Sequence, residues 1–195
     1  MTKTLADFED RTIAPGYVLK YLPNFLPPAE ATKWFERLLR ETPWTAEVVT
    51  MLGKQHVLRR QTAQFGRDYD YNPTSQAARE WAPLMLEVKA LVEQATHTTF
   101  ASALCNLYPD GAAKIGWHSD AGHPELIASL SLEAVRVFKF APIGSTKAVF
   151  SMEPAHGSLL LIPRVVNDAY KHSIAESKRC TEARINVTFR KFLAR

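Results

Sequence analysis

This 195-residue sequence has little cysteine, no long apolar run and no stretch at its start that resembles a secretion signal. Its two cysteines, Cys105 and Cys180, are too few for a disulfide framework and form no C-x-x-C pair, so we expect free thiols in a reducing compartment. No run of 18 apolar residues occurs, which excludes a transmembrane helix. The first ten residues, MTKTLADFED, hold three acidic side chains and no apolar stretch of signal-peptide length. We therefore expect an intracellular protein, which would be cytoplasmic in a bacterium and either cytoplasmic or nuclear in a eukaryote.

The sequence also has no large excess of charge of one sign. Lysine and arginine number 24 against 20 aspartates and glutamates, a net charge of only +4. This balance is compatible with an anionic partner such as nucleic acid, without demanding one. A hydrophobic content of 46% and a charged content of 23% exclude a disordered, collagen-like or coiled-coil chain. The length suits one domain, residues 1–195, with a full core and no membrane partner, and we expect a monomer.

Residues 1–99 carry helical patterns and one hairpin pattern. The first 26 residues indicate an irregular arm with one short strand at most. A helix is predicted after Pro27-Pro28, because apolar residues recur there at helical spacing before Pro43 ends it. Residues 44–65 have β character around a turn at 52–54, which predicts a hairpin. A second helix is predicted from Pro83, a favourable first-turn residue, to Thr96.

From residue 100 to 192 the pattern changes to short apolar or alternating segments separated by Pro, Gly and Asp. Eight strands are predicted, at about 100–107, 113–118, 127–132, 135–140, 147–152, 157–162, 169–173 and 184–190. Strands that follow two helices indicate an α+β domain whose β part is a sandwich or a barrel.

A candidate metal site follows from His118-Ser119-Asp120 at the end of one predicted strand. Residues two apart in extended chain point to the same side, so His118 and Asp120 can bind one ion together. Two imidazoles and one carboxylate are the ligands of a non-haem Fe(II) facial triad, and His172 on another strand is the natural second histidine. A His-x-Asp pair is weak evidence by itself, because such short patterns arise by chance.

A second pattern strengthens the first. Strand alternation over residues 184–190 sends Arg184, Asn186, Thr188 and Arg190 to one side and the apolar residues to the other. A solvent-facing strand would explain this side simply, as it does for most arginine pairs. Inside a barrel, however, two arginines require a dianion such as 2-oxoglutarate, a dicarboxylate that pairs with both. Asn106 and Tyr108 again place two polar groups on one side of a strand, although that spacing alone is ordinary.

Together these motifs resemble the AlkB-type Fe(II)/2-oxoglutarate-dependent dioxygenases. The resemblance is dense over residues 100–192 and runs through Asn106-Leu107-Tyr108 with Gly111, Trp117-His118-Ser119-Asp120, 127–132, His156-Gly157-Ser158-Leu159, His172 and 184–190. It implies a double-stranded β-helix, or jelly roll, supported by two N-terminal helices and a hairpin lid over the substrate. It also implies oxidative decarboxylation of 2-oxoglutarate to succinate and CO₂. The coupled hydroxylation of an N-methyl group would release formaldehyde and a demethylated base.

The resemblance also assigns roles to individual residues. His118, Asp120 and His172 would bind Fe(II), leaving positions for 2-oxoglutarate and O₂. Arg184, assisted by Tyr108, would hold the distal carboxylate of the cosubstrate. Arg190 and Asn106 would hold the carboxylate beside the keto group, with Asn186 on the same cosubstrate-binding side.

The hairpin and the stretch after it carry the substrate prediction. The resemblance suggests a lid that faces methylated DNA or RNA, with Leu52 at the turn as a wedge into the base stack. Basic and aromatic residues there suit phosphate contact and base stacking, although a solvated hairpin explains the charges about as well. The predicted substrate-binding residues are Leu52, Arg59, Arg60, Phe65, Tyr71 and Trp117.

The sequence departs from the family in ways that affect the substrate. Nucleic-acid-repairing members usually have acidic residues directly after the His-x-Asp pair, where this chain has Ala121-Gly122, and usually a small residue where Glu133 stands. The same chemistry on a protein side chain, a lipid or a small metabolite is therefore the alternative. A non-enzymatic binding module is disfavoured, because all three ligands and both arginines are present. His156 is expected to be structural.

Overall fold

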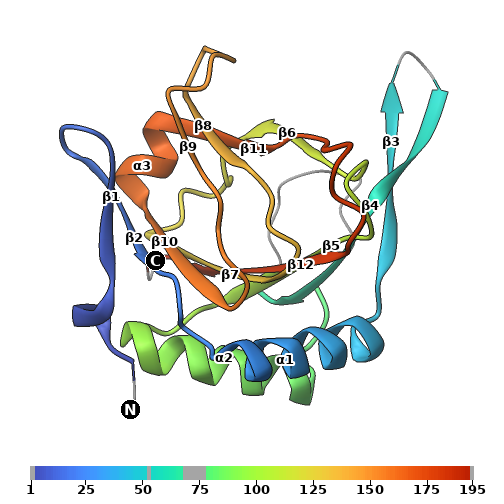
Figure 1. Ribbon diagram of the computed structural model, residues 1–195, viewed down its shortest axis with the longest axis horizontal. Coiled ribbons are helices and arrows are strands. Elements are labelled where there is room, and N and C mark those ends of the chain that lie inside the picture. Colours follow the sequence, from blue (N-terminus) through green and yellow to red (C-terminus); the bar gives the residue numbers. More distant parts are fainter. Residues whose placement is uncertain (1–2, 52–53, 68–77, 194–195) are drawn as a thin grey trace.

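The computed structural model describes residues 3–51, 54–67 and 78–193, and in it two antiparallel β-sheets face each other above two helices (Figure 1). The eight-stranded sheet has the order β1-β2-β10-β7-β12-β5-β4-β3, and the four-stranded sheet has the order β6-β11-β8-β9. The strands are β1 Glu9–Ala14, β2 Tyr17–Leu22, β3 Thr45–Met51, β4 Lys54–Gly66, β5 Ser102–Tyr108, β6 Ile115–His118, β7 Leu126–Glu133, β8 Phe138–Pro142, β9 Phe150–Met152, β10 Ser158–Pro163, β11 Tyr170–Ile174 and β12 Arg184–Lys191.

The eight strands predicted after residue 100 are all present, as β5 to β12. Four of them (β5, β12, β7 and β10) lie side by side in the large sheet, and the other four form the small sheet. Successive strands mostly alternate between the two sheets, so the chain winds around the space between them. This is the arrangement of a jelly roll, as predicted.

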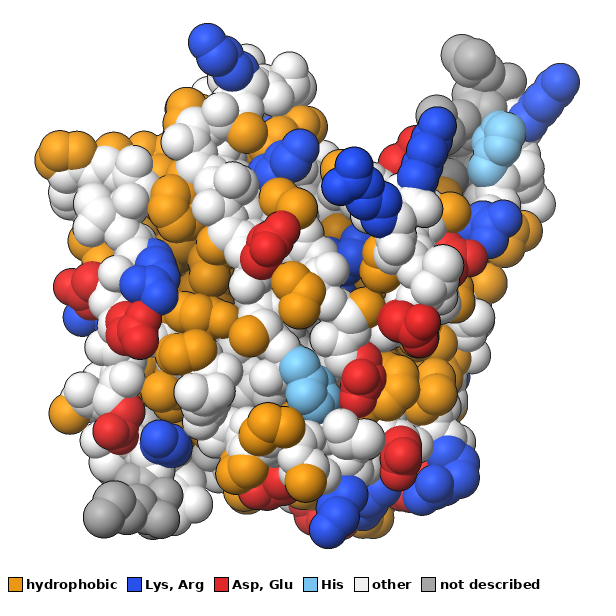
Figure 2. All heavy atoms as spheres, viewed as in Figure 1, with side chains coloured by type: hydrophobic (Ala, Val, Ile, Leu, Met, Phe, Trp, Pro, Cys, Tyr) orange, Lys and Arg blue, Asp and Glu red, His pale blue; other side chains and the backbone are white. Residues whose placement is uncertain are grey.

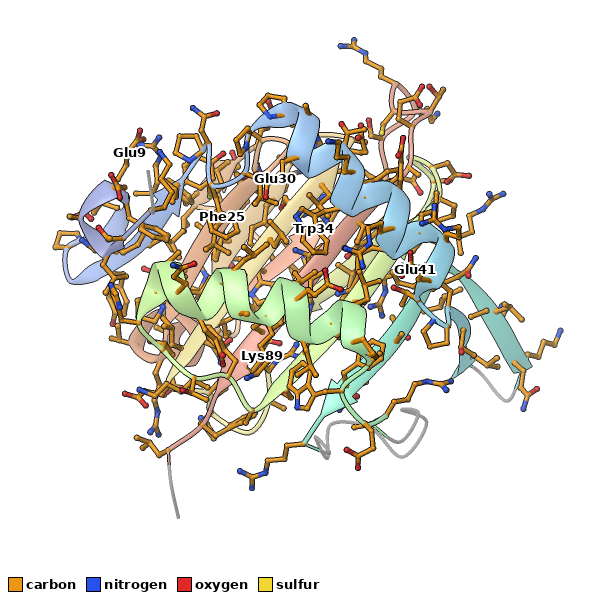
Figure 3. The ribbon with its side chains drawn as sticks, turned by 90° about the horizontal axis from the view of Figure 1, so that it is seen from below. Glu9, Phe25, Glu30, Trp34, Glu41 and Lys89 are labelled. Carbon is orange, nitrogen blue, oxygen red and sulfur yellow. The ribbon has the colours of Figure 1, made fainter. Side chains whose placement is uncertain are left out.

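The helices α1 (Pro28–Glu41) and α2 (Pro83–Thr96) lie side by side across the outer face of the large sheet (Figure 3). Both begin with proline at a position where a missing N–H costs nothing. Their apolar sides, with Leu38 and Val88 among them, pack against the sheet and bury a common core. The described residues also form two short helices, the 3₁₀ helix η1 (Leu5–Asp7) and α3 (Arg164–Ala169). Along the described chain, no helix is both long enough and apolar enough to cross a bilayer.

The large sheet has two different faces because its strands alternate. On β12, Ile185, Val187 and Phe189 are buried in the helix-facing core. The polar residues that alternate with them point to the opposite face, toward the small sheet, and are buried as well. They are Arg184, Asn186, Thr188 and Arg190. The alternation predicted for 184–190 is therefore present, and both sides of this strand are interior.

Two parts of the fold differ from the prediction. The N-terminal arm is a regular hairpin, β1–β2, and β2 pairs with β10 to extend the large sheet. The short helix α3 lies between the predicted strands β10 and β11, in a segment for which no element was predicted. The hairpin predicted at 44–65 is β3–β4, and residues 52 and 53, where the turn was predicted, lie outside the described residues.

Candidate metal and cosubstrate site

A cavity lies between the inner faces of the two sheets. All eight residues predicted to bind metal or cosubstrate line it: Asn106, Tyr108, His118, Asp120, His172, Arg184, Asn186 and Arg190. They come from both sheets, since His118 and His172 belong to the small sheet and the asparagines and arginines to the large one. The jelly roll thus brings together residues that are up to 84 positions apart in the sequence.

The two histidines lie directly opposite each other on β6 and β11. Their ring centroids are 4.4 Å apart. Asp120 follows the end of β6, and its Oδ2 lies 3.6 Å from His172 Nε2. The His118 Nδ1 is 2.8 Å from the Gly116 carbonyl oxygen, to which it donates as Nδ1–H, so Nε2 keeps its lone pair.

The protonation states in this cluster suit a divalent metal. Burial lowers the pKa of His172 to about 3 and also lowers the pKa of His118, so both rings are neutral at pH 7. Burial is the largest single effect on Asp120 and would raise its pKa, but the Arg190 guanidinium and the neighbouring His172 and His118 together outweigh burial and hold this pKa at about 2. Two neutral imidazoles and one carboxylate are the donor set that Fe(II) takes in facial-triad sites.

Arg190 also shapes how Asp120 is presented. Its Nε donates to Asp120 Oδ1 at 2.7 Å, and its Nη2 contacts the same oxygen. The other oxygen, Oδ2, faces His172. Within the described ranges, no group of three or more His, Cys, Asp or Glu side chains has the spacing to hold a metal ion. The donor chemistry nevertheless fits Fe(II), with Oδ2 as the available carboxylate atom.

Arg184 marks the opposite end of the cavity. It is only 2% exposed, and its Nη2 donates to Ser131 Oγ at 2.9 Å. Its Nε and Nη1 are buried with no hydrogen-bond partner in the part of the chain that the structure describes. Tyr108 is its register partner on β5, with the ring centroid 5.4 Å from the Arg184 Cζ. Buried guanidinium donors without partners are costly, and a carboxylate in the cavity would satisfy them.

Asn186 differs from its prediction. Its amide nitrogen donates to Ser129 Oγ at 2.8 Å and to the Leu130 carbonyl at 2.9 Å, while its Oδ1 accepts from Thr188. Both amide hydrogens are therefore used inside the protein, and neither is left for a carboxylate. The geometry gives Asn186 the task of bracing the cavity wall.

Arg136 supports a residue of the site, Tyr108, and sequence reasoning missed it. This buried side chain donates from Nη2 to the carbonyls of Gly111, Ala113 and Ala175 at 3.1, 2.9 and 2.6 Å. Its Cζ lies 5.9 Å from the ring centroid of Tyr108, so two guanidinium groups contact that ring. Arg136 thus holds the loop that follows β5. A single arginine between apolar residues has no periodic signal that would reveal such a role.

The predicted substrate residues on β4 fall on opposite faces of the sheet. Phe65 is 2% exposed and lies with Ala63 in the helix-facing core. Its predicted role in stacking on a base is therefore wrong, because strand alternation turns it away from the cavity. Arg60 points to the other face, is buried, and donates from Nη1 to Asn106 Oδ1. Arg60 thus contacts a cosubstrate residue rather than an exposed surface.

The other substrate residues are either at the surface or outside the described residues. Arg59 is exposed and pairs with Asp110 at 3.0 Å, whereas Trp117 is half-buried beside His118 on β6. Leu52 and Tyr71 lie outside the described residues. Lysine and arginine side chains gather on and beside the projecting β3–β4 hairpin (Figure 2). His156 is structural as expected: its Nδ1 accepts from the Glu133 backbone N–H at 2.8 Å.

The fold and the site together define a class: an antiparallel jelly roll whose inner face carries a 2-His-1-carboxylate set beside buried arginines is typical of non-haem Fe(II) oxygenases. Comparison with known families agrees, since residues 18–190 match the 2OG-Fe(II) oxygenase superfamily. The chain belongs to this superfamily, and to its AlkB-type members.

Individual relatives make the placement more specific. The chain is 34% identical to the DNA oxidative demethylase ALKBH2 of Mus musculus, over 85% of this chain and 76% of that protein. It is 32% identical to the alpha-ketoglutarate-dependent dioxygenase alkB homolog 3 of Bos taurus, over 86% of this chain. It spans 64% of the length of that bovine relative. The solved structure of OsALKBH1 shares the fold, with a TM-score of 0.66, 17% identity and coverage of 89% of this chain and 97% of that one.

Proposed function

We propose that this protein is an Fe(II)- and 2-oxoglutarate-dependent dioxygenase that oxidatively demethylates N-alkylated nucleobases, of the 1-methyladenine and 3-methylcytosine type, in DNA or RNA. One observation carries the chemical part of the proposal. A single cavity holds two neutral histidines and a carboxylate at one end and a buried guanidinium with unsatisfied donors at the other. The relatives named as demethylases support the substrate part.

In this proposal His118 Nε2, His172 Nε2 and Asp120 Oδ2 hold the metal. Fe(II), once bound with 2-oxoglutarate and O₂, supplies the oxidant for C–H hydroxylation. The protein's own contribution is to keep both imidazoles neutral by burial and the carboxylate ionised beside Arg190. No proton has to leave these three groups near neutral pH when a metal binds.

The cosubstrate would lie between Arg184 and the metal ligands. Arg184 pairs with the distal carboxylate through Nε and Nη1, which have no partner within the described chain. Arg190 and Asn106 face the carboxylate beside the keto group. Arg60 decides how the Asn106 amide is turned: a guanidinium can only donate, so the Asn106 oxygen must face it. One hydrogen of the Asn106 NH₂ group is directed to the Leu104 carbonyl at 3.4 Å, and the proposal gives the other to the cosubstrate carboxylate. Asn106 is thereby prepared to donate to a carboxylate.

Charge supports a dianionic cosubstrate. Arg184 and Arg190 line the cavity, Arg60 is buried beside it against Asn106, and Asp120 is the one carboxylate among the described lining residues. The charges of a divalent metal and a dianion cancel, so binding both leaves the net charge of the cavity unchanged. A neutral cosubstrate would leave the arginines and the metal without compensation.

Nucleic acid is proposed as the substrate because exposed cations lie on and next to the hairpin beside the cavity. Lys54, Arg59 and Arg67 are exposed there, and such groups bind phosphates without sequence preference. A target base would have to leave its stack to reach the cavity. We also propose that the enzyme acts as an intracellular monomer.

A second candidate keeps the chemistry and changes the substrate to a protein side chain, lipid or small metabolite. It is favoured by Ala121 and Gly122, which directly follow Asp120 and carry no carboxylate that could accept from the exocyclic amine of a base. Discrimination among bases would have to come from elsewhere in the site.

The experiment that tests both candidates is mass spectrometry of products after incubation with Fe(II), 2-oxoglutarate and O₂. Oligonucleotides with 1-methyladenine or 3-methylcytosine, single-stranded and duplex, are compared with methylated protein and metabolite panels. Loss of 14 Da from an oligonucleotide with matching formaldehyde supports demethylation of bases, about one formaldehyde per succinate. Succinate production without any change in the oligonucleotides would favour the second candidate.

A further inference from the structure

The short helix α3 lies against the loop that carries Asp120. It connects β10 to β11 and therefore directly precedes the strand that carries His172. Its residue Asn167 is only 2% exposed, and this buried polar side chain points to the backbone of Asp120. None of the sequence patterns indicated a role for Asn167.

Two hydrogen bonds join Asn167 to Asp120. The Asp120 backbone N–H donates to Asn167 Oδ1 at 2.9 Å, and Asn167 Nδ2 donates to the Asp120 carbonyl at 2.8 Å. Only one orientation of the amide satisfies both bonds, because the oxygen must accept and the nitrogen must donate. The side chain therefore binds Asp120 as the peptide group of a neighbouring strand would.

Asp120 needs such a partner because of where β6 ends. The register between β6 and β11 pairs His118 with His172, and Asp120 lies two residues beyond that pair. Its backbone groups are nevertheless buried and must be satisfied. Asn167 continues the ladder with its side chain at the point where the strand backbone no longer can.

The same helix holds the next residues of the loop. The Arg164 backbone N–H donates to the Glu125 carbonyl at 3.1 Å, and Asp168 Oδ1 lies 2.9 Å from His123 Nδ1. Between these contacts the chain reverses, with positive φ at Gly122 (+71°) and His123 (+49°). The His123 and Asp168 contact is at the surface, whereas the Asn167 contact is buried and touches the residue that carries the carboxylate.

We infer that Asn167 is a positioning residue for the metal-binding carboxylate of Asp120. The inference rests on the proposed Fe(II) site. Fixing the Asp120 backbone on both sides of its Cα limits where Oδ2 lies relative to His172, and a rigid ligand set binds metal more tightly. Aspartate at 167 would keep the acceptor and lose the donor, and alanine would lose both. Loss of such a supporting contact typically weakens metal affinity about 10- to 100-fold.

The test is the affinity of the purified apoprotein for Mn(II), a stable substitute for Fe(II), followed by the EPR signal of free Mn(II). Wild type is compared with Asn167→Ala and Asn167→Asp, and His172→Ala defines loss of the site. Asp168→Asn is the matched control, because it changes the neighbouring residue of α3, which holds the same loop at the surface. Thr96→Ala is the control for stability, since it removes a buried hydrogen bond within α2, far from the cavity.

The inference expects about 10- to 100-fold weaker Mn(II) binding in both Asn167 variants and less than threefold change in Asp168→Asn and Thr96→Ala. Should Asn167→Ala be insoluble, Asn167→Asp carries the comparison, because it keeps the volume and one hydrogen bond. Wild-type affinity in Asn167→Asp would overturn the inference, as would an equal loss in Thr96→Ala at a matched decrease in Tm. If wild type and His172→Ala bind Mn(II) equally poorly, the proposed metal site itself is wrong and the inference falls with it.

Discussion

His118 on β6 and His172 on β11 are direct register partners, with ring centroids 4.4 Å apart. They are 54 residues apart in the sequence, and the antiparallel pairing of two strands in the small sheet brings them together. The position of one histidine therefore depends on the register of the other strand. A ligand pair built across a ladder is held by backbone hydrogen bonds rather than by a mobile loop.

The first prediction concerns His172. Replacing it with alanine removes one of two imidazoles, so turnover of 2-oxoglutarate should fall below detection. The measurement is succinate formed from 2-oxoglutarate with Fe(II) present. His97→Asn is the control, because His97 is exposed and its left-handed backbone (φ +49°) suits asparagine. A His172→Ala variant that decarboxylates at the wild-type rate would show that the triad assignment is wrong.

The second prediction concerns Arg184. Alanine at 184 removes the charged partner of the distal carboxylate and should raise the KM for 2-oxoglutarate by roughly 30-fold to a few thousand-fold, equivalent to about 2 to 5 kcal/mol. Arg184→Lys should restore only part of the affinity for 2-oxoglutarate, since an ammonium group cannot reproduce the planar two-donor geometry of a guanidinium. Steady-state succinate assays at varied 2-oxoglutarate measure both variants. An unchanged KM in Arg184→Ala would place the cosubstrate elsewhere.

The third prediction compares two neighbours on β4. Arg60→Met removes the donor that turns the Asn106 amide and should raise the KM for 2-oxoglutarate by about tenfold, near 1.4 kcal/mol. Arg59→Met should leave that KM unchanged and weaken oligonucleotide binding with a reduced salt dependence, because Arg59 is exposed. Fluorescence anisotropy at several salt concentrations provides the second measurement. If Arg60→Met instead weakened oligonucleotide binding and left the KM for 2-oxoglutarate unchanged, Arg60 would be a substrate-binding residue, as first predicted.

The fourth prediction concerns pH. In the metal-free protein burial lowers the pKa of His172 to about 3 from an ordinary 6.5. Between these values the unfolded chain binds a proton that the folded chain does not, so stability falls as the pH drops from about 6.5 toward 3. Asp120, with a pKa of about 2 instead of 3.8, acts in the same direction at lower pH. Urea unfolding with a chelator present should show this slope reduced in His172→Asn. An equal slope in both proteins would contradict the prediction.

The fifth prediction concerns Leu52, which lies outside the described residues, between the end of β3 and the start of β4 in the sequence. If it wedges into a base stack, Leu52→Ala should lower demethylation of duplex more than of single strands, because only the duplex requires unstacking. The ratio of the two kcat/KM values measures the effect. Lys54→Ala serves for comparison and should weaken both substrates through lost phosphate contact. An equal decrease in kcat/KM for both substrates in Leu52→Ala would contradict the role of Leu52 as a wedge.

Much of the catalytic core follows from local sequence patterns. The alternation of residues 184–190 has a period of two, and it predicted correctly that both arginines share one side of β12. The helices after Pro28 and Pro83 were predicted because apolar spacing and proline position are local signals. Such features need only neighbouring residues, and for that reason sequence alone determined them.

Other features depended on which strands became neighbours. Phe65 and Arg60 both looked suited to bind nucleic acid, but the pairing of β4 with β5 turns one into the helix-facing core and the other toward Asn106. Arg136 and Asn167 are single polar residues whose partners lie 23 or more positions away. No periodic pattern reveals contacts of that kind. Sequence by itself determined the strands after residue 100, the polar side of β12 and the metal-ligand types. Tertiary structure alone decided which buried polar groups orient the site residues, because those hydrogen bonds form only after the sheets have closed around the cavity.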